Sequence, residues 1–249
     1  MSRSKCILPR ARGFTIIELL TVIALMAVLA GIVVAGLGGF GGATVPASQR
    51  SVAGLIDAAR TTAQVRQSDA YLLIYAGQDE PSKYLRYMGI VWVERMENGE
   101  NVIHPVGDGT YLPEGTYVIP RADNETPVSL AAGADGELYE SDIGGTAVEE
   151  VAYPQRTADP DRWFVLGFES SGQTTLRTLS NPNTFYTGLP RSPVIVISPG
   201  IAEQVGSGVE LRVTDPFSSA AVFVRPNGQT VMMNDFQEIS DTLDDQADD

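Results

Sequence analysis

The pattern of apolar and polar positions first separates an apolar segment at the start of the chain. Residues 14–37 contain a single charged residue, Glu18. A helix of this length, about 24 residues, would measure roughly 36 Å, which is enough to cross a hydrocarbon core of about 30 Å. The pattern therefore predicts a transmembrane helix over residues 14–37.

A glycine-rich stretch and a second helical pattern follow. Glycines crowd residues 38–47, and each one weakens a helix by about 0.5–1 kcal/mol relative to alanine. We therefore expect a flexible joint there. Across residues 48–67, apolar side chains recur every three or four positions, which predicts an amphipathic helix with one apolar face: Val52, Leu55, Ile56, Ala59 and Ala63.

The remaining pattern is that of β-strands. Residues 70–75 form the first strand-like run, and residues 221–224 and 230–233 flank a Pro-Asn-Gly turn typical of a hairpin. We expect a β-rich globular head over residues 68–234, with an irregular insertion at about 120–160. The acidic segment 235–249 has no Lys or Arg and is expected to be solvated and mobile. The predicted fold class is α+β.

Composition narrows the possible functions. The chain has 17 Lys and Arg against 31 Asp and Glu, a formal net charge of −14 and a pI near 4.4, which argues against a nucleic-acid partner. It has one Cys and one His, so an intramolecular disulfide, a cysteine-built metal site and most catalytic triads are excluded. We expect no cofactor, no metal and no catalytic residue.

Three features resemble functional sites only weakly. His104 is interpreted as an ordinary polar residue at a strand end. Residues 167–172 lack the Gly-x-Ser-x-Gly spacing of a nucleophile elbow, and a hairpin turn explains them better. Acidic residues at 135–137 and 244–249 have the hard oxygen ligands that calcium prefers, but the tail lacks the turn glycines that would order such a site.

The first 13 residues carry no acid and four basic residues, Arg3, Lys5, Arg10 and Arg12. A basic segment before an apolar run holds the N-terminus on the cytoplasmic side of a membrane. Glu18 is unusual there, because a carboxylate within the apolar core costs on the order of 2.5–3.5 kcal/mol and usually has a partner. One interpretation is a glutamate near the interface that reaches toward the lipid headgroups.

A second interpretation starts from the sequence Gly13-Phe14-Thr15-Ile16-Ile17-Glu18, followed by the apolar run. It resembles the prepilin signal of type IV pilins and of the pseudopilins of type II secretion. The resemblance implies a pilin fold, in which a long N-terminal helix, half in the membrane and half amphipathic, packs on an antiparallel β-sheet head. It also implies that prepilin peptidase removes residues 1–13 by cleavage after Gly13 and N-methylates Phe14.

The resemblance assigns Glu18 a role in assembly. In a helical filament, the new ammonium group of Phe14 can lie beside the Glu18 of a neighbouring subunit, and loss of one member of such a buried pair typically costs 3–5 kcal/mol. Three small residues at four-residue spacing, Ala27, Gly31 and Ala35, would let helices pack closely in a filament core. Glu18 would then set the register of the subunits.

A softer resemblance concerns the subgroup. Residues 59–63 read Ala-Arg-Thr-Thr-Ala and resemble an element at the end of the long helix in H-type minor pseudopilins. The implied function is a structural subunit of a type II secretion pseudopilus, in the inner membrane before assembly, with a periplasmic head. The implied partners are prepilin peptidase, other pilin-like subunits, the inner-membrane assembly platform and membrane lipid. A minor type IV pilin, or a membrane-anchored enzyme or binding module, remains an alternative.

Overall fold

The computed structural model describes the helical residues 16, 17, 19–23, 25 and 26 near the N-terminus and most of the chain from residue 41 onward. The described residues of this second part are 41–96, 101–121, 126–143, 148–155, 157–181, 183–186, 190–206 and 208–247. The chain divides into two units, Met1–Phe40 and Gly41–Asp249. We call the second unit the head.

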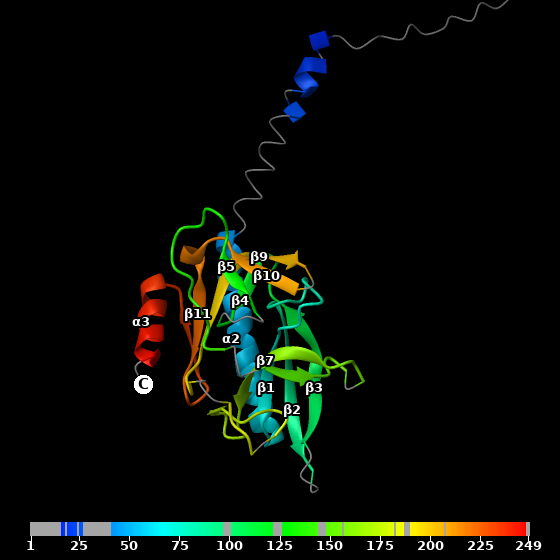
Figure 1. Ribbon diagram of the computed structural model, residues 1–249, viewed down its shortest axis with the longest axis vertical. Helices are drawn as coiled ribbons and strands as arrows, with labels where there is room; N and C mark the ends of the chain where they lie inside the picture. Colours follow the sequence, from blue (N-terminus) through cyan, green and yellow to red (C-terminus); the bar gives the residue numbers. More distant parts are fainter. Residues whose placement is uncertain are drawn as a thin grey trace, which may run out of the picture. The chain divides into compact units, whose positions relative to one another are not determined.

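The head consists of helices and short strands in the order shown in Figure 1. Its elements are α2 (Gly41–Arg66), β1 (Ala70–Tyr75), β2 (Tyr87–Arg95), β3 (Asn101–Tyr111), β4 (Thr116–Ile119), β5 (Val128–Leu130), β6 (Val148–Val151), β7 (Asp161–Phe168), β8 (Thr174–Thr175), β9 (Val194–Val205), β10 (Gly208–Val213), a 3₁₀ turn (Pro216–Ser218), β11 (Ala220–Val224), β12 (Thr230–Met233) and α3 (Phe236–Ala247).

The strands form two sheets of six strands. The resemblance implied an antiparallel β-sheet head without giving the number of sheets. The first has the order β3-β2-β1-β7-β6, with β8 paired to β7, and all its pairs are antiparallel. The second has the order β12-β11-β9-β10-β5, with β4 paired to β9, and its β10–β5 pair is parallel. The head is therefore α+β and mainly antiparallel.

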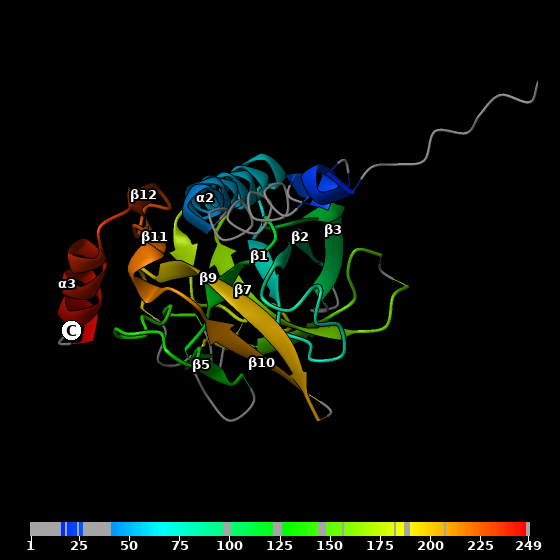
Figure 2. The same ribbon diagram turned by 90° about the horizontal axis from the view of Figure 1, so that it is seen from above.

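Helix α2 packs against strands of both sheets and joins them into one core (Figure 2). Its buried positions recur every three or four residues and include Val52, Ile56, Ala59 and Ala63. Strand β1 is buried along its whole length, and Leu72 and Ile74 face the core shared with α2. The opposite face of the first sheet carries a second, aromatic cluster around Trp163.

Helix α2 begins at Gly41, whereas the glycine-rich sequence predicted a joint over residues 38–47 and a helix from residue 48. Pro46 lies inside the helix. The buried Ser48 and Gln49 bind the sheets in this region: the Ser48 hydroxyl lies 2.6 Å from that of Thr116, and Gln49 Nε2 donates to the carbonyls of Ala221 and Met233, both at 2.8 Å. These contacts offset the weak helical preference of the glycines and Pro46.

Two further segments contain regular structure that the sequence pattern did not predict. The acidic segment 235–249, expected to be mobile, contains helix α3, which Asp235 begins by accepting the backbone N–H of Gln237 on Oδ1 at 2.9 Å. Buried Ile239 connects α3 to the core. The stretch 120–160, expected to be irregular, contributes the strands β5 and β6.

Candidate functional site

The N-terminal apolar segment is the region to which the sequence assigns function. Its described residues 16, 17, 19–23, 25 and 26 are helical. The Thr21 hydroxyl donates to the Ile17 carbonyl at 2.7 Å, one helical turn earlier, so this polar side chain is satisfied by its own helix. Such an arrangement lets a threonine lie in apolar surroundings at little cost.

The apolar side chains of this segment are exposed. The exposed fraction is 82% for Ile16 and 72% for Ile17, and the others are Leu19, Leu20, Val22, Ile23, Leu25 and Met26. A helix that carries apolar side chains on every face is stable only when lipid or other helices surround it. Within the described part of the chain, no helix is both long enough and apolar enough to cross a membrane.

The residues with predicted roles lie outside the described ones. This holds for the cleavage and methylation residues Gly13 and Phe14 and for the assembly residue Glu18. It also holds for the small residues expected to pack between helices, Ala27, Gly31 and Ala35. Their roles therefore remain predictions from the sequence.

In the head, His104 belongs to an aromatic and charged cluster at the C-terminal end of α2. Its ring stacks on Trp92 with centroids 4.2 Å apart, and its Nε2 lies 2.8 Å from a carboxylate oxygen of Glu94. The guanidinium of Arg66 lies 5.1 Å from the Trp92 ring centroid, at cation–π distance. The sequence did not indicate this stack, because its members come from three separate elements.

The serine-containing segment 167–172 is the predicted hairpin turn. Gly167 and Phe168 pair with Thr175 and Thr174, and the Gly172 N–H donates to the Glu169 carbonyl at 2.7 Å. Gly172 has a φ of +82°, which favours glycine. The segment connects β7 and β8, and this architecture differs from the strand-to-helix turn of a nucleophile elbow.

Ion pairs in the head connect distant strands. Asp69, at the end of the turn after α2, is buried and accepts Arg95 Nη2 at 2.6 Å, and Arg177 Nη1 lies 3.6 Å from the same carboxylate. Asp142 is buried too, and its Oδ2 accepts the Val194 backbone N–H at 2.7 Å. Burial raises the pKa of Asp142, although this hydrogen bond and the charge of Arg121 lower it. These carboxylates hold the head together.

The described residues contain no group of three or more His, Cys, Asp or Glu side chains arranged to hold a metal ion. Asp135 and Glu137 are among those residues, whereas residues 248 and 249 are outside them. The geometry of the described head thus supplies structural contacts, and the chemistry predicted from the sequence belongs to the N-terminal segment.

Comparison with known proteins also points to the N-terminal segment. The family model of the prokaryotic N-terminal methylation motif matches residues 8–34, a range that includes Gly13, Phe14 and Glu18. No curated protein and no solved structure matches the chain. The motif implies processing by prepilin peptidase and assembly with other pilin-like subunits. The N-terminal segment is therefore similar to that of type IV pilin-like proteins, a class that includes pilins and pseudopilins.

Proposed function

We propose that this chain is a minor pseudopilin, a structural subunit of the type II secretion pseudopilus that drives protein export. The observation that carries the proposal is the N-terminal methylation motif at residues 8–34. The subunit enters the inner membrane with its N-terminus in the cytoplasm and its head in the periplasm, and it later joins a periplasmic filament. It binds the inner-membrane assembly platform and, before assembly, membrane lipid.

Processing creates the group that assembly needs. Cleavage after Gly13 removes all the basic residues of the leader and leaves a single ammonium group on Phe14. In the filament this ammonium pairs with Glu18 of a neighbouring subunit, so both charges find a partner in apolar surroundings only when subunits assemble. Prepilin peptidase methylates the Phe14 nitrogen after the cut and before assembly, and the methylated nitrogen keeps its positive charge.

The head favours a minor subunit of the H type. Two six-stranded sheets make a large head, which suits a subunit present in few copies rather than one packed in long arrays. In the Ala-Arg-Thr-Thr-Ala element, Ala59 and Ala63 are fully buried, and Arg60 Nε donates to the Gly172 carbonyl at 3.2 Å. This element therefore joins the end of α2 to the β7–β8 turn.

The second candidate function is that of a minor type IV pilin, which the same motif supports. We propose that in either case the chain is not an enzyme and binds no nucleic acid. The acidic composition is the basis for the second statement, because phosphate backbones attract clustered Lys and Arg.

Substitution of Glu18 tests the proposal. We expect Glu18→Leu and Glu18→Val to enter the membrane but to be lost from filaments, with a matching loss of protein secretion, because the Phe14 ammonium no longer has a partner. Thr21→Val is the control from the same segment, since its hydroxyl donates to the Ile17 carbonyl of its own helix, and it should assemble normally. Normal assembly of both Glu18 variants would refute the role of Glu18.

A further inference from the structure

Helix α3 is anchored to the core at its beginning. Asp235 caps it through the 2.9 Å hydrogen bond from the Gln237 N–H, and Ile239 is the one buried residue of the stretch 237–242. The side-chain hydrogen bonds of this stretch stay inside the helix, and none of the ion pairs between described residues involves it. One cap and one apolar side chain therefore hold the first half of α3.

The charges of α3 oppose its second half. Asp244 and Asp245 belong to the last turn, at the negative end of the helix dipole, where a cation is favoured, and this turn has no basic residue. Asp241 precedes them by three and four positions, a spacing at which like charges repel each other. A helix of 12 residues is also marginal in water on its own. The second half of α3 therefore needs a cation from another part of the head.

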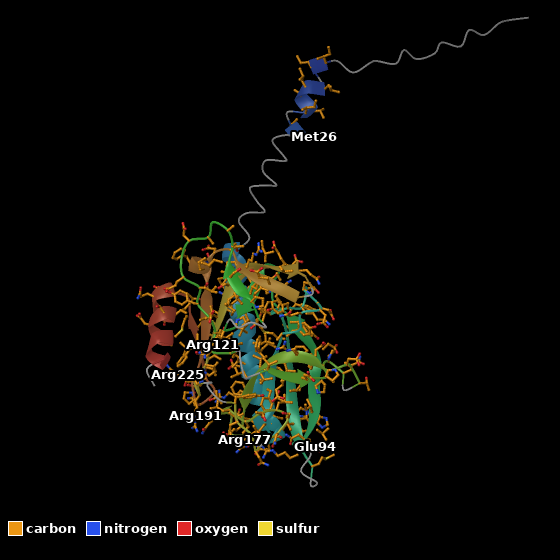
Figure 3. The ribbon with its side chains drawn as sticks, in the orientation of Figure 1. Met26, Glu94, Arg121, Arg177, Arg191 and Arg225 are labelled. Carbon is orange, nitrogen blue, oxygen red and sulfur yellow. The ribbon has the colours of Figure 1, made fainter. Side chains whose placement is uncertain are left out.

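The topology of the second sheet brings one arginine level with this end of α3. Strands β11 and β12 are antiparallel, and α3 begins shortly after β12 ends, so the helix runs back in the direction of β11. Figure 1 and Figure 2 both show α3 beside β11, which it contacts. The helix rises about 18 Å and β11 extends about 17 Å, so the last turn of α3 comes level with the end of β11. Arg225 directly follows β11, and Figure 3 shows it near this end of α3.

Arg225 is available to the last turn of α3. Its side chain is exposed, and none of the ion pairs between described residues includes it. Its backbone is fixed, because its N–H donates to the Gln229 carbonyl at 2.8 Å and its carbonyl accepts the Gly228 N–H at 2.7 Å. The Val224 N–H also donates to the Pro193 carbonyl at 3.0 Å. Only side-chain freedom is therefore lost when the guanidinium binds.

We propose that α3 is a clasp on the second sheet, closed when the Arg225 guanidinium binds the acidic last turn of the helix. An arginine there meets carboxylates, the last carbonyls of the helix and the negative end of its dipole. Because the contact is exposed, dissolved salt weakens it, and loss of the cation frees the second half of α3 and uncovers the part of β11 that the helix contacts. The inference goes beyond the proposed function, because it requires neither cleavage after Gly13 nor Glu18.

Hydrogen–deuterium exchange of the full-length chain in detergent micelles, followed by mass spectrometry, measures the state of the clasp. At about 50 mM salt, Arg225→Glu should lower the protection of residues 240–247 at least about threefold, because an attraction becomes a repulsion. About 500 mM salt should remove most of this difference between the variant and the wild type. Arg50→Glu, which changes an exposed arginine on α2 in the same way, is the matched control and should alter the protection less than about twofold.

A charge swap identifies the partner of Arg225. In the background Asp244→Arg, Asp245→Arg, the same Arg225→Glu substitution should raise the protection of residues 240–247, because opposite charges again face each other. The sign of the effect thus reverses, whatever the two new arginines add to the helix on their own. The protection of β1 is the internal reference for correct folding. No effect of Arg225→Glu, or an effect of the same sign in both backgrounds, would overturn the proposal and leave the clasp without its charged contact.

Discussion

Gln49 lies on the buried face of α2, where an apolar side chain is the usual occupant. Its amide nitrogen donates to the carbonyls of Ala221 and Met233, on two neighbouring strands of the second sheet. The apolar stripe of α2 could be predicted from the sequence, but the role of Gln49 could not, because both acceptors lie more than 170 residues further along the chain.

Truncation of this side chain should destabilise the head. We expect Gln49→Ala to lower the free energy of unfolding by about 1–3 kcal/mol, because two buried carbonyls lose their donor. Gln64→Ala removes a similar amide from the exposed face of the same helix, where Nε2 bonds the Ser171 carbonyl at 3.3 Å, and should have almost no effect. Chemical denaturation of both variants measures the difference, and equal costs would contradict the account.

Asp142 gives a pH-dependent prediction. Because burial raises its pKa in the folded protein, its contribution to stability is present below the unfolded pKa and is lost as the pH rises through the folded value. The asparagine in Asp142→Asn cannot ionise, so the stability of this variant does not fall with rising pH for this reason. We expect the stability of the wild type relative to Asp142→Asn to increase between pH 7 and about pH 4. Denaturation curves over this range test it, and a relative stability that falls on acidification would be contrary to it.

At the scale of elements, α2 holds the two sheets together. Its residues contact β1 and β2 of the first sheet and β9 and β11 of the second. Ile56 is fully buried in the shared core, so Ile56→Ala should cost about 2–5 kcal/mol. Val65→Ala on the same helix, where the side chain is 74% exposed, should stay within about 0.5 kcal/mol. Thermal or chemical unfolding of both variants measures the difference. Similar losses of stability would contradict the assignment of Ile56 to the shared core.

Elements with a strong local pattern were predictable, and elements fixed by distant contacts were not. Strand β1 spans the six residues predicted for it, and the β11–β12 hairpin surrounds the predicted turn. The start of α2 at Gly41, the helix α3 and the division of the strands into two sheets depend on contacts between distant segments. Local propensity therefore did not predict the start of α2 at Gly41 or the helix α3.

At the scale of the whole molecule, function is assigned to the N-terminal segment. Cleavage, methylation and charge pairing are predicted from residues close together in the sequence, Gly13, Phe14 and Glu18, and these predictions need no structure. The stack of His104 on Trp92 beside Arg66 could not be predicted, because its members come from three separate elements.

Replacement of Gly13 should stop processing. We expect Gly13→Leu to give a stable, membrane-embedded precursor that is absent from filaments, because the bulkier side chain blocks the cut and the basic leader keeps the N-terminus at the cytoplasmic face. Immunoblots of membrane and filament fractions, with Ala47→Leu in the head as a processing control, measure both effects. Assembly of the uncut variant would show that cleavage is not required.

Mass spectrometry of the N-terminus of the protein recovered from assembled filaments tests the central claim most directly. The account predicts a chain that begins at Phe14, carries one additional methyl group on its terminal nitrogen and lacks Cys6. A full-length chain that still contains Cys6 within those filaments would contradict the cleavage site, and with it the pairing of the Phe14 ammonium with Glu18.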